Sequence, residues 1–118
     1  MAIVLPSGNI FMTSELVVVL ITAAHRTEAE KIARALVSER LAACVNVQRD
    51  VKSIYRWEGA VREDGEFLLI AKTRRSLVER VAARVKELHG YELPETIALP
   101  IVGGSARYLE WVEKETLS

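Results

Sequence analysis

The clearest pattern in the chain is an alternation of apolar and polar residues in its middle, between residues 43 and 72. From Val45 to Trp57 the odd positions carry most of the apolar and aromatic residues, and most polar residues fall between them. A two-residue period is typical of a strand, so we expect the apolar and aromatic side chains to share one face. The return strand, residues 66–72, follows the turn-forming residues 63–65, and the long strands meet at residues 57–59.

This hairpin is too long for a small domain to cover. A strand that begins at residue 43 and ends near Trp57 would span roughly 50 Å at about 3.3 Å per residue. One end should therefore overhang, and it would carry Tyr55 and Trp57. We expect the base of the hairpin to belong to the fold and its tip to serve in association.

The rest of the chain alternates strand and helix patterns. Residues 16–21 are an unbroken apolar run, which is typical of a strand covered on both faces. Helical spacing over residues 27–41 and 76–88 predicts two amphipathic helices. Each begins with capping-box spacing, and Gly90 is available as the left-handed residue that ends the second. A strand at 96–102 should lie at a sheet edge, because Pro100 cannot donate a hydrogen bond. Gly103-Gly104 should break this strand. A last helix is expected at 106–116.

This order predicts an α+β fold, a ferredoxin-like βαββαβ sandwich with a C-terminal helix. Two helices cover one face of a four-stranded sheet, yet the predicted strands are apolar on both faces. A bare apolar face of several hundred square ångströms is unusual for a monomer. We therefore expect the second face to be buried against other copies of the chain in a closed homo-oligomer, with overhanging hairpins extending neighbouring sheets.

Composition narrows the class of protein. The chain has 118 residues, enough for one domain, which we place at residues 15–118. Residues 1–14 are expected to form a flexible extension rather than a signal peptide or membrane span. Sixteen basic residues balance sixteen acidic ones, so nothing global favours nucleic acid or an anionic membrane. Cys44 is the single cysteine, which favours a reducing compartment, the cytoplasm.

Few residues suggest chemistry. Paired acids, a nucleophile with its base, and a phosphate-binding glycine loop are all missing at the required spacing, so we predict that the protein is not an enzyme. His89 follows a helix end, where an imidazole stabilises free carbonyl groups; the alternative is a metal ligand. Cys44 in an apolar strand is expected to behave as a small buried hydrophobe, and His25 as a solvated turn residue.

The aromatic residues of the hairpin tip are more informative. Tyr55 and Trp57 are expected to be interface anchors, and they could also line a cleft if the oligomer interface forms one. Lys72 and the pair Arg74-Arg75 precede a helix, where they could meet an anion, although a solvated face is the alternative. Glu95 begins a strand and could pair with a neighbouring cation.

Several ordered motifs resemble the CutA family of divalent-cation tolerance proteins, over nearly the whole chain from Glu15 to Lys114. The motifs lie at residues 17–23, 39–46, 53–59, 72–73, 89–95 and 99–101. The resemblance implies a ferredoxin-like subunit in a tightly packed homotrimer, similar in architecture to the PII signalling trimers. It also implies tolerance of copper and other divalent cations, with copper(II) or another divalent ion as the bound species and no organic cofactor.

The ligand set that the resemblance implies is incomplete here. In the best-known bacterial form the proposed copper ligands are a cysteine late in the first strand and two adjacent histidines at the end of the second helix. Ile21 stands at the cysteine position, and the histidine pair reads Leu88-His89. His89 is therefore the one metal ligand that carries over.

Two hypotheses of different class follow, with a third that has no positive signature. The first is a trimeric divalent-cation tolerance protein that binds copper through His89. The second is a PII-like signalling or ligand-sensing trimer, whose cleft between subunits holds a small anion or a partner peptide. The residues expected to line this cleft are Tyr55, Trp57, Lys72, Tyr91 and Glu95. The third is a stable scaffold whose trimer is the whole functional unit.

Overall fold

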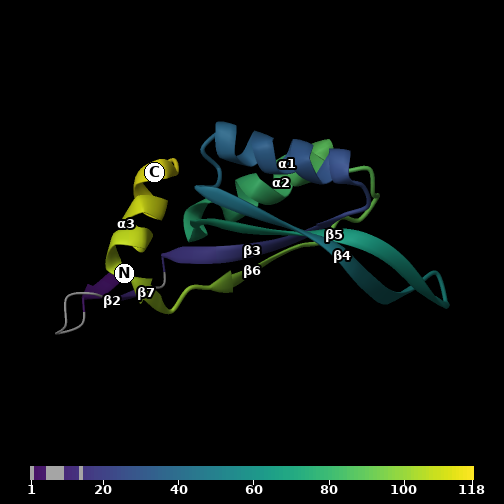
Figure 1. Ribbon diagram of the computed structural model, residues 1–118, viewed down its shortest axis with the longest axis horizontal. Helices are drawn as coiled ribbons and strands as arrows, with labels where there is room; N and C mark the ends of the chain where they lie inside the picture. The colour runs from purple at the N-terminus through teal and green to yellow at the C-terminus, as the bar shows by residue number, and fades with distance from the viewer. Residues whose placement is uncertain (1, 5–9, 14) are drawn as a thin grey trace.

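The computed structural model describes residues 2–4, 10–13 and 15–118 (Figure 1). Its helices are α1 (Arg26–Ser38), the short 3-10 helix η1 (Arg75–Leu77), α2 (Val78–Leu88) and α3 (Ala106–Glu115). Its strands are β1 (Ala2–Val4), β2 (Ile10–Thr13), β3 (Leu16–Ala23), β4 (Cys44–Trp57), β5 (Ala60–Arg74), β6 (Thr96–Pro100) and β7 (Gly103–Ser105).

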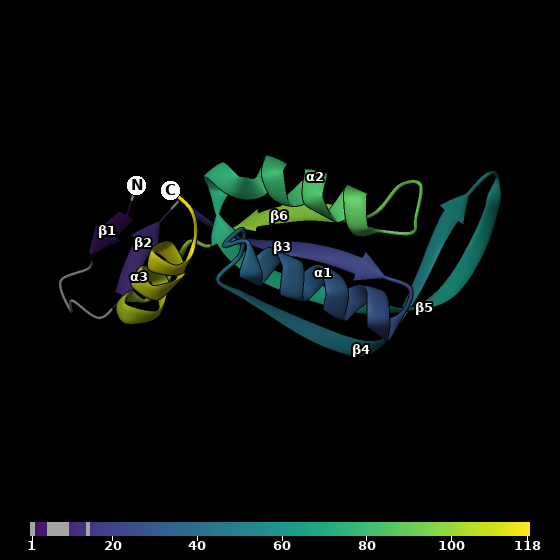
Figure 2. The same ribbon diagram turned by 90° about the horizontal axis from the view of Figure 1, so that it is seen from above.

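The main sheet has the order β4-β5-β3-β6, and every neighbouring pair is antiparallel. Helices α1 and α2 lie on one face of this sheet, as Figures 1 and 2 show. The sequence β3-α1-β4-β5-α2-β6 with α3 at the end confirms the predicted α+β fold with its βαββαβ order. Pro100 lies on β6, which is an edge strand as expected, so its missing N–H group interrupts no ladder.

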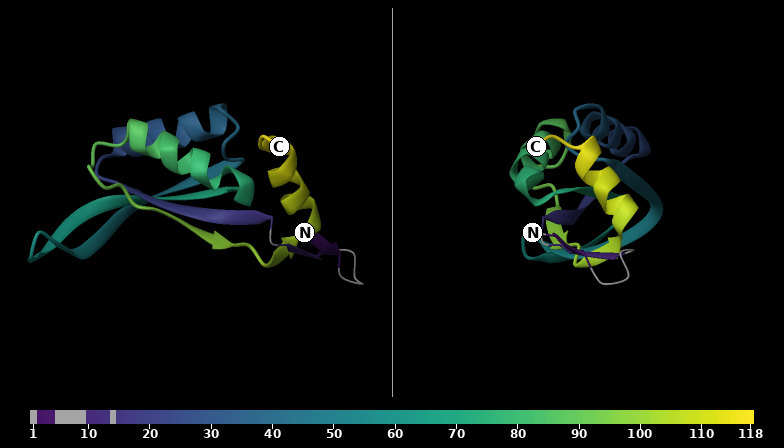
Figure 3. Two further views of the ribbon diagram at one scale, coloured as in Figure 1. Left: turned by 180° about the vertical axis from the view of Figure 1, so that it is seen from behind. Right: turned by 90° about the vertical axis from the view of Figure 1, so that its left-hand side faces the viewer.

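The central strand β3 explains where the core forms. Val17, Val19 and Ile21 point to the helices and are at most 3% exposed, and they pack with apolar residues of α1 and α2. The alternate positions point to the opposite face, where Ile97 and Leu99 of β6 are 52% and 51% exposed. Large apolar side chains therefore lie on the sheet face opposite α1 and α2, and Figure 3 shows these two helices on one side of the sheet.

The hairpin of β4 and β5 extends well past the two helices (Figure 1). Trp57 pairs with Ala60 at its tip, and the turn residues Glu58 and Gly59 have φ angles of 48° and 80°. Two positive φ values are typical of the tight turn that follows the twist of a hairpin. The predicted meeting point and the overhang are confirmed, and the long axis of the molecule is 51 Å.

Two expectations about the hairpin were wrong. Residues 63–65, expected to turn the chain, lie inside β5 and pair with residues 52–54 of β4. Pairing along the whole of β4 outweighs the turn preference of these residues. The second error concerns the face of the sheet on which the side chains of β4 lie. The register shifts by one residue between Gln48 and Val51, where Asp50 has a φ of 61°. This β-bulge adds a residue to β4 and reverses the alternation beyond it.

The bulge places the aromatic residues on the opposite face from the first valines of the strand. Val45 and Val47 pair with Ala71 and Leu69, which point to the helices, whereas Tyr55 pairs with Arg62 and lies on the uncovered face of the sheet. The apolar residues of β4, predicted to share one face, therefore lie on one face of the sheet before the bulge and on the other face beyond it. The sequence pattern hides the change, because the apolar residues stay at odd positions on both sides of the bulge.

The helix ends also differ from the capping-box predictions. The N-cap of α1 is the exposed His25, two residues before the expected Thr27, and it makes no side-chain cap bond. Ser76 lies within η1, and Leu77 stands at the N-cap of α2. At the other end of α2, His89 has extended backbone with φ −88° and ψ 144°, and Gly90 is not among the residues with positive φ. The predicted left-handed glycine is therefore wrong.

A second, three-stranded sheet has the order β1-β2-β7. Gly103-Gly104, expected to break a strand, instead pairs with residues 11–12 of β2 and forms β7. Residues 2–4 and 10–13 of the predicted flexible extension are thus in strands. Residues 1, 5–9 and 14 lie outside the described residues, and the flexibility of this extension stays a prediction.

Candidate functional site

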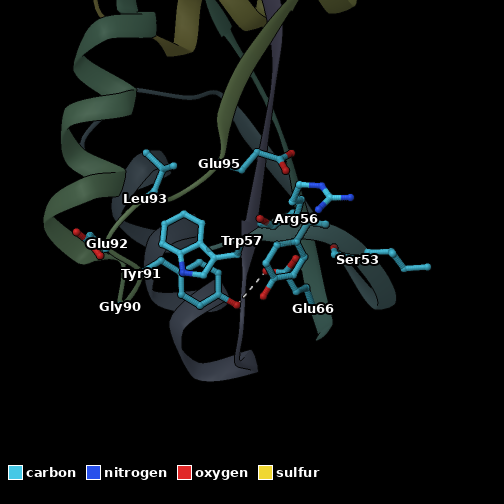
Figure 4. Close-up of a pocket in the computed structure, with 12 residues that line it drawn as sticks. Ser53, Arg56, Trp57, Glu66, Gly90, Tyr91, Glu92, Leu93 and Glu95 are labelled. Atoms are coloured by element: carbon cyan, nitrogen blue, oxygen red, sulfur yellow. Dashed lines mark hydrogen bonds between the residues drawn. The ribbon is translucent and has the colours of Figure 1, made fainter. Parts of the chain in front are cut away.

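A cleft of about 750 Å³ opens where the hairpin leaves the body of the subunit. One wall is the outer part of β4, and the other is the loop that connects α2 to β6. Within one subunit, the cleft brings together Tyr55, Trp57, Tyr91 and Glu95, which are four of the five residues expected from the sequence to line a cleft between subunits (Figure 4). Thr22, at the end of β3, also lines it.

Lys72 does not join this cleft within the subunit. It pairs with Cys44 at the base of the hairpin, where its ammonium group contacts the Asn46 side chain and lies 3.9 Å from the Cys44 sulfur. Cys44 is half-buried rather than fully buried as expected. Nearby, Arg74 donates to the Thr116 hydroxyl at 3.0 Å and to the Glu113 carbonyl at 2.5 Å, so it fastens the end of α3.

Glu66 is the residue of the cleft that the sequence did not reveal. It is 7% exposed, and its Oε2 accepts a hydrogen bond from the Tyr91 hydroxyl at 3.0 Å. Burial raises the pKa of Tyr91, and the hydrogen bond and negative charge of Glu66 raise it further. In the sequence, Glu66 is a charged residue between a predicted turn and an apolar run. Because residues 63–65 were predicted to form a turn, Glu66 was expected at the start of a strand, where charged residues are common.

A second tyrosine is held by a carboxylate farther along the hairpin. The Tyr55 hydroxyl donates to Asp64 Oδ2 across the two strands. This hydrogen bond is the main cause that raises the pKa of Tyr55. Both phenol groups of the cleft therefore stay protonated and act as hydrogen-bond donors at neutral pH.

His89 lies behind the cleft with its side chain fully buried. Its Nε2 is 2.5 Å from the Thr22 carbonyl oxygen, and its Nδ1 accepts a hydrogen bond from the Tyr91 backbone N–H at 3.0 Å. Since a carbonyl only accepts, this arrangement corresponds to a neutral imidazole with its proton on Nε2. The ring also packs on Tyr91, with centroids 4.6 Å apart. The structural role considered for His89 is therefore present in these contacts.

Glu28 of α1 brings a carboxylate to the same histidine. Its Oε2 accepts a hydrogen bond from the Gly90 N–H at 3.0 Å, and its Oε1 lies 3.5 Å from His89 Nδ1. Oε1 is buried and has no hydrogen-bond partner within residues 15–118. No pattern in the sequence indicates this contact, because Glu28 and His89 are far apart along the chain.

The other two positions of the implied copper site are apolar in space as well as in sequence. Ile21 is 0% exposed in the main core, and Leu88 packs against the same cluster. Within the described residues there is no group of three or more His, Cys, Asp or Glu side chains that could hold a metal ion. The donor atoms gathered in one subunit are therefore those of His89 and Glu28.

A family model described as CutA1 divalent ion tolerance protein matches residues 17–115. The chain belongs to the CutA1 divalent ion tolerance family. The match begins in β3 and ends at the last residue of α3, so it includes the cleft, His89 and the main sheet. It leaves out β1 and β2. The resemblance found in the sequence motifs is confirmed.

Named relatives agree with this membership. The divalent-cation tolerance protein CutA of Thermus thermophilus is 50% identical over 99 residues, which cover 84% of this chain and 96% of that protein. The chloroplastic protein CutA of Arabidopsis thaliana is 49% identical over 85% of this chain and 55% of its own length. The chain thus spans about half the length of the plant relatives it matches.

Solved structures of CutA1 proteins share the fold. The divalent cation tolerance protein of T. thermophilus superimposes with a TM-score of 0.85 at 49% identity, over 86% of this chain and 99% of that one. CutA1 of Oryza sativa gives 0.86 at 44% identity, over 90% and 97%. The T. thermophilus protein is named as a tolerance protein rather than as an enzyme. Among the described helices of this chain, each is too short or too polar to cross a membrane.

Proposed function

We propose that this protein contributes to divalent-cation tolerance, including copper homeostasis, and binds divalent ions such as copper(II) with His89 as a ligand. Family membership supports the tolerance role. The observation that carries the binding site is the pair formed by His89 Nδ1 and the unpartnered Glu28 Oε1, 3.5 Å apart. An imidazole nitrogen beside a carboxylate oxygen suits copper(II) and zinc(II).

The fit of a metal to one subunit is partial. Two donor atoms lie close together, and the bond from the Tyr91 N–H to His89 Nδ1 must open before that nitrogen can bind a metal. Further ligands would come from water or from another copy of the chain. The bound ion would be cargo rather than a catalytic group, and the role that we propose is not enzymatic.

Copper(II) titration calorimetry tests this site. Wild type should show saturable binding per subunit, and both His89→Gln and Glu28→Gln should weaken it by about tenfold or more, because each removes one donor atom. Glu28→Gln is the sharper variant, since the amide oxygen still accepts from the Gly90 N–H while the charge and one carboxylate donor atom are lost.

The matched control is Glu79→Gln, which removes an exposed carboxylate from the first turn of α2. It should bind copper as wild type does. Light scattering in the same buffer reports whether each variant keeps its oligomeric state. Equal copper affinity in wild type and both site variants would remove His89 and Glu28 from the proposal.

A second function is favoured by the cleft itself. We propose, as the alternative, a PII-like signalling or ligand-sensing role in which this cleft binds a small molecule. A volume of about 750 Å³ lies within the range of small-molecule sites, roughly 300–1,000 Å³. A ligand screen by shifts in melting temperature tests this role, and silence across charged and neutral metabolites would count against it.

Both functions are proposed for a homotrimer in the cytoplasm. The uncovered apolar sheet face supports self-association, with Ile97 and Leu99 about half exposed in the single subunit. The single cysteine supports a reducing compartment. Cell fractionation with an antibody to the protein would check the location.

A further inference from the structure

The charge of the cleft differs from that of the whole chain, which is neutral. Three carboxylates line it, from Glu66, Glu92 and Glu95, against one guanidinium, from Arg56. No ion pair joins Arg56 to these carboxylates within residues 15–118, so the negative charges are not neutralised there. A small anion, one of the two occupants expected from the sequence, would meet net repulsion in this cleft.

Glu66 is the carboxylate that most needs a partner. It is 7% exposed, and the partner that the structure gives it is the neutral Tyr91 hydroxyl. Across the described part of the chain, Glu66 forms no ion pair with a lysine, arginine or histidine. A buried carboxylate without a counter-charge is costly, and a cation that reaches it from the cleft would relieve that cost.

Aromatic rings form the rest of the binding surface. Tyr55, Trp57 and Tyr91 all line the same cleft, and Figure 4 shows the Trp57 indole and the Tyr91 ring together with the hydrogen bond from Tyr91 to Glu66. Electron-rich aromatic faces attract cations, most strongly ammonium and guanidinium groups that are partly removed from water. Neighbouring carboxylates strengthen this attraction.

We propose that the cleft binds a small organic cation, an amine or guanidine compound, with its charged group at Glu66 and its carbon skeleton against the aromatic rings. This inference rests on the ligand-sensing role and names the chemical class of its ligand. The cleft volume of about 750 Å³ suits an organic molecule. A bare metal ion fits less well, because the described residues bring no three metal-ligating side chains together.

Three probes with the same four-carbon skeleton isolate the charge. Calorimetry with the full chain would compare 1,4-diaminobutane, the neutral 1,4-butanediol and the dianion succinate, in a buffer free of amines. The diamine should bind saturably and more weakly as salt is added, and the other two should show no binding. A copper(II) titration runs in parallel as the independent check on the metal site.

The matched variants are Glu66→Gln and Glu110→Gln. Glu66→Gln keeps an acceptor for the Tyr91 hydroxyl and removes only the charge, so diamine affinity should fall about tenfold or more. Glu110 is exposed on α3, at the far end of the molecule from the hairpin, and Glu110→Gln should bind as wild type does (Figure 1). Trp57→Leu should also weaken diamine binding while leaving the charge intact.

The outcomes separate this inference from the proposed functions. Binding of succinate or the diol, but not the diamine, would overturn the cation class and leave the ligand-sensing role standing. Diamine affinity that is equal in wild type and Glu66→Gln would also overturn the inference. Copper binding without diamine binding would support the metal function alone. Displacement of the diamine by copper would identify the cleft as an inorganic cation site and overturn the organic ligand.

Discussion

At the scale of single residues, the loop after α2 is held by side chains that bond to backbone. His89 joins this loop to the end of β3 through the Thr22 carbonyl, and Glu28 joins it to α1 through the Gly90 N–H. A Cβ atom on residue 90 would lie 2.9 Å from Glu28 Oε2, so a larger residue there would require the Glu28 carboxylate to move. The loop is therefore fixed against the sheet before any ligand arrives.

Tyr91 should make stability depend on alkaline pH. Its folded-state pKa lies above that of an unfolded tyrosine, about 10, so the unfolded chain loses the phenol proton first. Stability from this group is complete below about pH 10 and declines as pH rises toward the folded pKa. Urea unfolding from about pH 9 to 11 should show a less steep decline in Tyr91→Phe than in wild type. Equal slopes would contradict it.

Some residues of the site were readable from sequence, and others were not. Tyr55 and Trp57 were found because their strand is too long to be covered, and Tyr91 and Glu95 because they belong to a motif. Glu66 and Glu28 were missed because burial and contact depend on segments that only the folded chain brings together. Lys72 lies opposite Cys44 within the subunit, so its place in a cleft between subunits stays a prediction.

At the scale of elements, the long apolar runs and helical periods gave the right order of strands and helices. Turn-forming residues and glycines were less reliable predictors of turns and strand ends, because pairing with a neighbouring strand overrides local preference. The turn-forming residues 63–65 are held extended by β4, and the glycines at 103–104 pair with β2, whose residues were expected to be flexible. A β-bulge leaves no mark in a binary pattern when the apolar residues keep their spacing, so the change of face in β4 was not predictable.

The hairpin turn gives a prediction at this scale. Gly59→Ala should lower the free energy of unfolding by about 1 kcal/mol, because alanine is strained at a φ of 80°. The space is open there, so strain rather than a clash is the cause. Chemical denaturation at one protein concentration measures the change. Gly65→Ala, in β5 with equally open space and no positive φ, is the control, and an equal loss in both variants would contradict the explanation.

At the scale of the whole molecule, the two faces of the main sheet differ in what covers them. One carries the core under α1 and α2, and the other presents apolar side chains that no described helix covers. Ile97 and Leu99 lie on an edge strand as well, so both an edge and a face are available to another copy. The overhanging hairpin gives each copy a long arm with which to reach a neighbour.

Leu99→Glu should break this association. A charge on the uncovered face cannot be buried against another subunit without a partner, so light scattering should show a mass below the trimer expected for wild type. Val37→Glu is the control, since Val37 is 42% exposed on α1, over the opposite face of the sheet. A wild-type mass in Leu99→Glu, or a mass of one subunit in wild type, would contradict self-association through this face.

The bulge at Asp50 sets a rule for how this chain can change over evolutionary time. The one extra residue of the bulge determines on which face of the sheet each residue of β4 between the bulge and the tip lies. Loss of that residue would turn Tyr55 and Trp57 to the other side while leaving the composition of the hairpin almost unchanged. Between the bulge and Tyr55, a change in length therefore keeps both aromatic side chains on the cleft side only when each strand gains or loses an even number of residues.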